Sequence, residues 1–173
     1  TLADDDLNHI NERRRPENRI GFALQLCALR YPGRFLSSSD VIPEQVIRFI
    51  GAQLGLAGDE LLPYAARRQT RQQHLKALRA IYGYRMFSGR GARDLKDWLE
   101  REAETARSNE DLARRFIEEC RRTQTVLPGV SVIERLCADA LVAAERQNEK
   151  QIADRQDDMM KGRLDDLLTE MVD

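Results

Sequence analysis

The chain reads Ile20-Gly21-Phe22-Ala23-Leu24-Gln25-Leu26-Cys27-Ala28-Leu29, and on a helix these residues are apolar almost all round. Pro16 precedes the stretch at the position that proline favours in the first turn of a helix. A helix without a polar face belongs in the interior of a domain. We therefore predict a central core helix that ends at the Tyr31-Pro32-Gly33 turn.

On either side of this stretch, helix start and stop signals and the spacing of apolar residues predict further helices and no convincing strand. Thr70 and Gln73 match a capping box, so Thr70 is the expected N-cap of one of these helices. The predicted fold class is all-α, a multi-helix bundle. We expect the helices at residues 4–14, 43–55, 71–82, 92–106 and 108–120, a short element at 63–66, and one helix or two in series from Ser131 onward.

The 173 residues carry a net charge of −1, with 42% hydrophobic and 33% charged side chains, which is typical of a folded protein. No apolar run approaches the roughly 18 residues that span a bilayer, and no secretory signal is visible, so we expect a cytoplasmic location and no membrane partner. Cys27, Cys120 and Cys137 form no Cys-x-x-Cys pair and are expected to be reduced core thiols. We expect neither a metal site nor a cofactor.

Charge is strongly segregated along the chain. Between Arg67 and Lys96 there are nine Lys/Arg residues and one acid, Asp94, which gives this stretch a net charge of +8. Such segregation creates a local positive field, and nucleic acid is the commonest polyanion that a protein of this kind meets. We call residues 67–96 the basic island.

The predicted helix 71–82 has two different faces. One carries Leu75, Leu78, Ile81 and Tyr82, with His74 among them; the other carries Gln72, Gln73, Lys76 and Arg79. A recognition helix needs one face fixed on a core and the other free to enter the major groove. With the short element before it, this helix is predicted to form a helix-turn-helix unit. The candidate DNA-binding residues are Arg67, Arg68, Thr70, Arg71, Gln72, Gln73, Lys76, Arg79, Arg85, Arg90 and Arg93.

Each of these assignments has a structural alternative. Long polar side chains can simply solvate an exposed helix face, and Arg85, Arg90, Arg93 and Lys96 can pair with acids on neighbouring helices. His74 is expected to be a packed or capping histidine rather than a base reader. A second cluster, Arg13-Arg14-Arg15 with Arg19, either complements the dipole of the first helix or contacts phosphate.

The sequence contains no pattern that indicates an enzyme active site. The sequence lacks a phosphate-cradling glycine loop, a Ser/His/Asp arrangement with family context, and enough histidines for a metal cage. No catalytic residue is predicted.

Three segments, over roughly residues 10–150, resemble the opening of the replicative bacterial transposases of the Tn-three family. They are Arg13 to Arg34, Tyr64 to His74 and Leu127 to Leu136. The resemblance implies a bacterial helical region that recognises the terminal inverted repeats of a transposon, with Arg67, Thr70, Arg71 and His74 in a motif of the family. It also implies that the Asp-Asp-Glu catalytic centre and its two metal ions lie downstream, outside this chain.

The expected domains are a helical DNA-binding region at 1–144, with a possible break into two small subdomains near 84–91, and a helical extension or linker at 145–173. The expected partner is double-stranded DNA at transposon ends, with possible self-association through 145–173. The alternative function is a helical assembly or dimerisation module with only non-specific DNA affinity. RNA binding has little support because no aromatic platform is interleaved with the basic residues.

Overall fold

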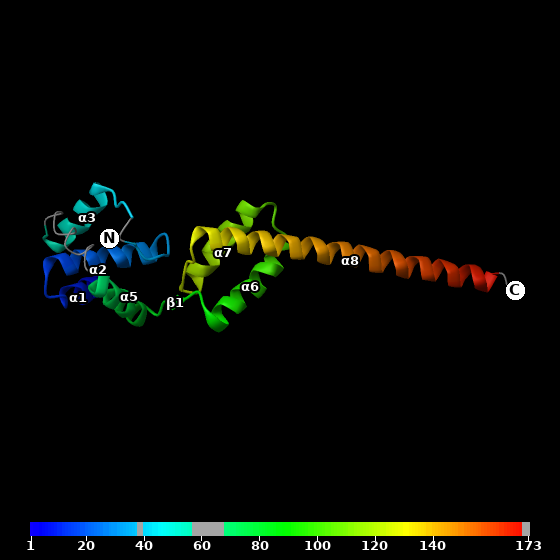
Figure 1. The fold of residues 1–173 in the computed structure, drawn as a ribbon, viewed down its shortest axis with the longest axis horizontal. Coiled ribbons are helices and arrows are strands. Elements are labelled where there is room, and N and C mark those ends of the chain that lie inside the picture. Colours follow the sequence, from blue (N-terminus) through cyan, green and yellow to red (C-terminus); the bar gives the residue numbers. More distant parts are fainter. Residues whose placement is uncertain (38–39, 57–67, 171–173) are drawn as a thin grey trace. The chain divides into compact units, whose positions relative to one another are not determined.

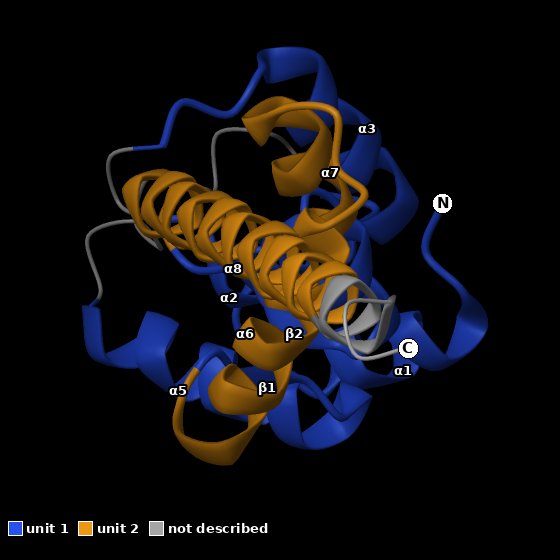
Figure 2. Ribbon diagram, turned by 90° about the vertical axis from the view of Figure 1, so that its right-hand side faces the viewer, with its two compact units in different colours: residues 1–87, 118–128 blue, residues 88–117, 129–173 orange. Residues whose placement is uncertain are grey.

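The computed structural model describes residues 1–37, 40–56 and 68–170, and their side chains as far as residue 164. This part of the chain is all-α apart from two short strands (Figure 1). It divides into two compact units, which Figure 2 shows in different colours. Unit 1 comprises Thr1–Phe87 and Glu118–Pro128, and unit 2 comprises Ser88–Ile117 and Gly129–Asp173.

Unit 1 is built around the predicted core helix. Helix α2 (Pro16–Arg30) contacts α1 (Asp4–Asn11), α3 (Glu44–Leu54) and α5 (Arg68–Tyr82). All but one of residues 20–29 are buried, Cys27 being partly exposed, so the prediction for this stretch is confirmed. The core also takes in Ile10, Ile50, Leu78 and Val126 from the surrounding elements.

The first helix ends earlier than predicted, at Asn11 instead of Arg14. Arg15 immediately precedes Pro16, and its backbone is extended, with φ −113° and ψ 141°. A residue before proline is sterically pushed out of the helical region, which stops the first helix from running into the second. The predicted element at 63–66 lies outside the described residues.

Two strands of two residues each were not predicted. β1 (Arg85–Met86) pairs in parallel with β2 (Thr125–Val126). Just after β2, the Leu127 amide donates to the carbonyl of Gly33, with N and O 2.9 Å apart. Two residues are too few to show the alternating pattern that identifies a strand in a sequence.

Unit 2 contains α6 (Gly89–Ala103), the first part of α7 (Asn109–Arg122) and α8 (Val130–Glu170). Leu95, Leu99 and Ala103 of α6 are buried, as are Ile133, Leu136, Cys137, Ala140 and Ala144 of α8, and the two helices are in contact. The segment from Val130 is one helix, which settles the choice between one helix and two. No helix in the described ranges is both long and apolar enough to cross a membrane.

Helix α6 begins at Gly89, three residues before the predicted start, with Ser88 as its N-cap. Gly89 and Gly91 therefore lie in its first turn. In α7, the predicted start at Ser108 is confirmed, because the Ser108 hydroxyl accepts a hydrogen bond from the Asp111 amide at 3.1 Å.

Candidate nucleic-acid interface

Helix α5 presents a polar face to solvent, and we call the exposed residues Gln69, Gln72, Gln73 and Lys76 the α5 face. These positions follow one another at the spacing that places side chains on one side of a helix. The α5 face carries one positive charge and no acid. Amides and an ammonium group can both donate hydrogen bonds to base edges and phosphates.

The opposite side of α5 is fixed on the core by His74 and Leu78, which are both buried. The His74 ring meets Phe22 of α2 edge-on, with ring centroids 5.2 Å apart and an interplanar angle of 79°. Burial, together with the nearby charge of Arg13, lowers the pKa of His74 to about 4. His74 is thus neutral at pH 7 and packed, as expected, and is not available to read bases.

A buried carboxylate fixes the C-terminal end of α5. Asp6 of α1 accepts hydrogen bonds from both Nη atoms of Arg30, at 2.7 and 2.8 Å, and from the hydroxyl of Tyr82, at 2.8 Å. Burial by itself would raise the pKa of Asp6, but the hydrogen bonds from Arg30, the Ala3 amide and Tyr82 lower it to about 2. One carboxylate therefore joins α1, α2 and α5.

The predicted N-cap role of Thr70 is wrong. Helix α5 already includes Arg68, so Thr70 lies within its first turn and is partly buried. The capping-box pattern misled because Thr and Gln three residues apart also fit inside a helix. A cap residue precedes the first helical residue. Because Arg68 is already helical, Thr70 lies too far along the helix to cap it. Arg67 lies outside the described residues.

Arg79 was expected on the outward side of α5 with Gln72 and Lys76, yet it is only partly exposed. Its Nε atom is buried and has no hydrogen-bond partner in the described part of the chain. Arg79 therefore lies at the edge of the α5 face, with part of its side chain against the protein. Among the described residues, no carboxylate oxygen lies within 4 Å of the charged atoms of Arg68, Lys76 or Arg79.

The other predicted contacts do not belong to the α5 face. Arg85 lies in β1 and donates through Nη2 to the carbonyl of Thr123 at 3.0 Å. Arg90 and Arg93 are exposed on α6, in unit 2. Two exposed acids, Asp94 and Asp97, follow Arg93 in the same helix, so the exposed side of α6 has mixed charge.

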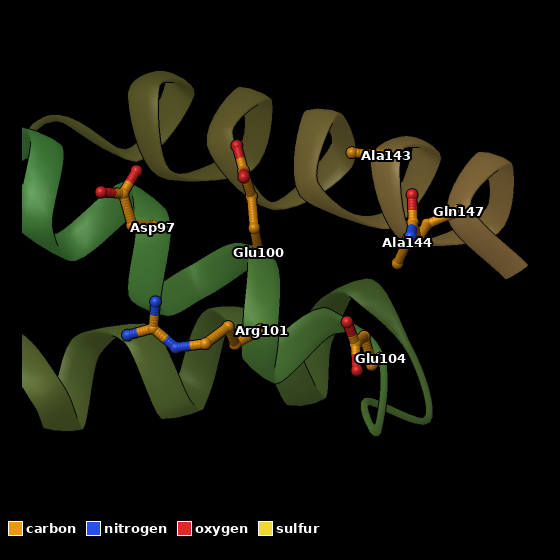
Figure 3. Close-up of a pocket in the computed structure, with 7 residues that line it drawn as sticks. All are labelled: Asp97, Glu100, Arg101, Glu104, Ala143, Ala144 and Gln147. Atoms are coloured by element: carbon orange, nitrogen blue, oxygen red, sulfur yellow. The ribbon is translucent and has the colours of Figure 1, made fainter.

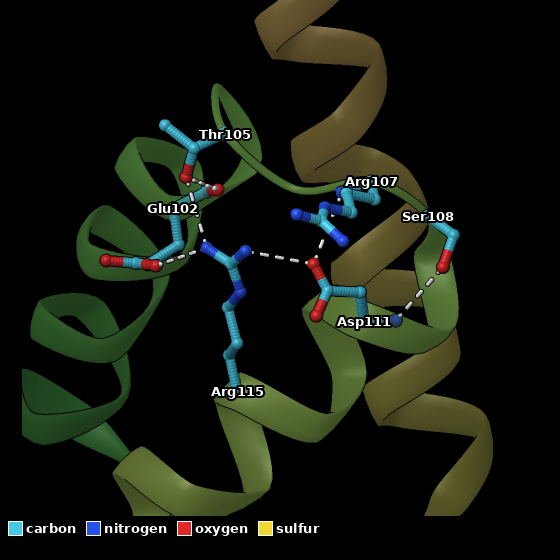
Figure 4. Close-up of polar contacts among 6 residues, drawn as sticks. All are labelled: Glu102, Thr105, Arg107, Ser108, Asp111 and Arg115. Atoms are coloured by element: carbon cyan, nitrogen blue, oxygen red, sulfur yellow. Dashed lines mark hydrogen bonds and ion pairs between the residues drawn. The ribbon is translucent and has the colours of Figure 1, made fainter.

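The arginines of α7 show what a neutralised helix looks like in this protein. Arg115 meets Glu102 at 3.0 Å and Asp111 at 2.9 Å (Figure 4). A hydrogen bond from the Arg107 amide, together with Arg115, lowers the pKa of Asp111. The same helix contains two further ion pairs. Nη2 of Arg114 lies 3.5 Å from Oε1 of Glu110, and Nη2 of Arg122 lies 2.6 Å from Oε1 of Glu119.

Most of the second basic cluster has a structural role. The guanidinium of Arg13 stacks over the Phe22 ring at 4.8 Å from its centroid and pairs with Glu12 at 3.0 Å. Arg19 donates to the carbonyl of Arg13 at 2.9 Å. Nη1 of Arg15 lies 3.8 Å from Oε1 of Glu17, and Arg14 is exposed. Arg13 also donates through Nε to the carbonyl of His9, in the last turn of α1, with N and O 3.4 Å apart. This contact favours the helix-dipole role over phosphate binding for Arg13.

Unit 2 has a surface pocket of about 370 Å³ between α6 and α8. The side chains of Asp97, Glu100 and Arg101 of α6 and of Glu104, its C-cap, line the pocket together with Ala143, Ala144 and Gln147 of α8 (Figure 3). Three of the four charged groups are acids, so the pocket disfavours a polyanion. It contains none of the predicted DNA-binding residues.

Comparisons with known proteins give a consistent result. Residues 1–140 match the family model described as "Domain of unknown function (DUF4158)". The chain is 34% identical over 168 residues to the transposase for transposon Tn21 of Escherichia coli, which is 97% of this chain and 17% of that protein.

Two further relatives agree with this match. The transposase for transposon Tn501 of Pseudomonas aeruginosa is 33% identical over 171 residues, and that for Tn1546 of Enterococcus faecium is 32% identical over 173 residues. These matches cover 97% and 98% of the chain and, in both cases, 17% of the relative. The chain thus spans about one sixth of the length of the curated relatives it matches.

Proposed function

The chain belongs to the DUF4158 family and to the Tn-three family of transposases, and from this premise we propose that it binds double-stranded DNA at the ends of a transposon. The relatives are transposases by name, and an enzyme of that class must find its transposon's termini. We attribute the chemistry of transposition to parts of the protein outside this chain, because the chain covers only 17% of those relatives.

A single observation supports the proposal most strongly: α5 is fixed on one side and open on the other. His74 and Leu78 are buried, and Tyr82 is tied to the Asp6 carboxylate. The α5 face is exposed, and no described carboxylate neutralises Lys76. A rigid helix with one uncovered cationic face can enter a major groove without moving its own core.

We propose separate roles for the residues of the α5 face. Gln72 and Gln73 have side-chain amides of the kind that form paired hydrogen bonds with adenine N6 and N7. Lys76, at the C-terminal end of the face, holds phosphates together with Arg68 and Arg79. The predicted helix-turn-helix remains part of this proposal, with α5 as its second helix.

The proposal is tested by fluorescence anisotropy with a labelled duplex from the parent transposon's terminus and a scrambled duplex of equal length. We expect Lys76→Ala to weaken binding to both duplexes alike, because a phosphate contact carries no sequence information. Gln72→Ala should cost about 1–3 kcal/mol on the terminal duplex and little on the scrambled one, because a base contact is lost. Affinity for both duplexes should fall steeply as salt rises.

Lys150→Ala is the matched control, since it removes the same exposed charge from α8, which belongs to unit 2 and not to unit 1. It should leave both affinities unchanged within about twofold. Equal affinity of the parent chain for terminal and scrambled duplexes would show that this chain does not supply specificity. That result would favour the assembly module with non-specific DNA affinity.

A further inference from the structure

Helix α8 continues far beyond the body of unit 2. Its buried residues end at Ala144, and every side chain from Glu145 to Leu164 is exposed. The helix nevertheless runs on to Glu170. Most helices in proteins gain their stability from an apolar face packed against something else. An apolar face on this segment would therefore gain stability from a partner that covers it.

One side of the segment is apolar. Ile152, Met159 and Met160 are 57%, 68% and 64% exposed. At about 100° per residue they lie on one side of the helix together with Ala153 and Gln156. The α8 residues buried with α6, such as Leu136 and Ala140, project in roughly the opposite direction. The exposed side thus points away from α6, and a partner could approach it without meeting that helix.

The charges on this side are arranged symmetrically. Gln156 lies at its centre, Glu149 precedes it by seven residues and Arg163 follows it by seven. Both charged side chains are exposed, and neither forms an ion pair with another described residue. Residues 145–164 contain five acids and five bases, so the segment is neutral as a whole. We call Glu149, Ile152, Ala153, Gln156, Met159, Met160 and Arg163 the α8 stripe.

We infer that the α8 stripe binds the same stripe of a second copy of this chain, with the two helices antiparallel and a two-fold axis at Gln156. In a two-fold interface, residue i contacts residue j and residue j contacts residue i. This axis places Ile152 opposite Met160 and Glu149 opposite Arg163 of the other copy. Each apolar side chain then meets an apolar one, and each charge meets its opposite.

The alternative orientation is disfavoured by the same charges. In a parallel, in-register pair, Glu149 would face Glu149 and Arg163 would face Arg163, which is repulsive at both ends. The antiparallel arrangement turns both repulsions into attractions and still places each apolar side chain opposite an apolar one. The stripe is only about four turns long, so we expect an association in the micromolar range and not an obligate dimer.

The association is tested by sedimentation equilibrium of the 173-residue chain without DNA, at concentrations from about 5 to 500 μM. We expect a monomer–dimer equilibrium. Glu149→Lys should raise the dissociation constant about tenfold, because each dimer then contains two Lys–Arg contacts in place of two ion pairs. Arg163→Glu should do the same. The double variant Glu149→Lys/Arg163→Glu should return to within about threefold of the parent, because the pairs are restored with reversed sign.

Orientation is tested separately with single cysteines and a mild oxidant. Gln156→Cys should form a disulfide-linked dimer, because the two positions meet on the axis. Ile152→Cys should not, because the two positions are offset by about 12 Å along antiparallel helices at 1.5 Å per residue. The parent chain is the control for its own cysteines, of which Cys120 and Cys137 are buried.

A chain that stays monomeric at 500 μM would overturn the inference. So would a double variant that associates no better than the two single variants, because the charges would then not be paired across copies. Cross-linking through Ile152→Cys would establish the parallel orientation and would also overturn it. Because no DNA is present, none of these outcomes depends on the proposed DNA binding.

Discussion

Helices α5 and α7 each contain four cationic side chains, in 15 and 14 residues. Helix α7 also contains four carboxylates, and ion pairs join Arg114, Arg115 and Arg122 to acids. Helix α5 contains no carboxylate at all. The number of arginines and lysines in a helix is therefore not enough to indicate that the helix binds a polyanion. What matters is whether the fold has already supplied their counter-charges.

The largest effect is expected when α5 is released from its core. Asp6→Ala removes the only acceptor that the described residues show for the Tyr82 hydroxyl, together with both hydrogen bonds from Arg30. We expect a loss of about 2–4 kcal/mol in the free energy of unfolding, because breaking a buried polar network leaves its other members without partners. Urea denaturation followed by far-ultraviolet circular dichroism measures this change.

Asp5→Ala is the control, since Asp5 is a neighbouring but exposed acid of α1. It should change the free energy of unfolding by less than about 0.5 kcal/mol. Equal losses in the two variants would show that the network does not fix α5.

As the pH falls, the packing of His74 on the inner side of α5 should weaken at a higher pH than the contacts of Asp6 with Arg30 and Tyr82. The pKa of folded His74 is about 4, below its ordinary value of 6.5, so folding favours the neutral ring. The contribution of His74 to the free energy of unfolding is fully present above pH 6.5 and is lost as the pH falls to about 4. This loss is at most about 3 kcal/mol. Asp6, whose folded pKa is about 2 against 3.8, adds a separate loss only below about pH 4.

Urea denaturation across pH 7 to 3 checks this sequence of losses. His74→Leu should remove the dependence between pH 6.5 and 4 while keeping the loss at lower pH. An unchanged pH profile in His74→Leu would contradict the assignment of the upper step to this histidine.

A single substitution can make the α5 face more like α7. Gln72→Glu places an acid four residues before Lys76, the favourable spacing for an ion pair on a helix. We expect the free energy of unfolding to rise by a few tenths of a kcal/mol. Affinity for DNA should fall about tenfold, or about 1.4 kcal/mol, because Lys76 is neutralised and an acid faces phosphate. The opposite signs of the two effects separate a binding role from a structural one.

The reverse substitution on α7 should have the smallest effect. Glu110→Gln frees Arg114 from an exposed pair at 3.5 Å. We expect a loss of about 0.3–0.5 kcal/mol in the free energy of unfolding. DNA affinity should rise by less than twofold. A tenfold gain would mean that any unpaired arginine in this chain binds DNA, and the contrast between the two helices would lose its meaning.

Local chemistry made most of the fold predictable. The unbroken apolar run around Phe22, the proline at the start of α2 and the glycine that ends α3 each act through neighbouring residues, and the structure follows them. The two strands, in contrast, depend on a backbone contact between residues about 40 positions apart. No pattern within either pair of residues indicates such a contact.

The candidate site was predictable in part, for the same reason. Helical spacing placed Gln72 and Lys76 outward and His74 inward, which requires only the period of one helix. It could not show that Arg79 has its Nε atom buried, nor that Asp6, distant in sequence, holds Tyr82. Those features arise from contacts between helices. The role of the α5 face in binding DNA stays a prediction.

The path of the chain through unit 1 has a consequence for its evolution. Val126 belongs to the core around α2, yet it is separated from Phe87 by a stretch that belongs to unit 2. A recombination event that joined residues 1–87 to a foreign protein would leave a hole where Val126 packs and an unpaired β1. Changes in the exposed helix faces of unit 1 should therefore arise by substitutions on a retained scaffold rather than by exchange of whole modules.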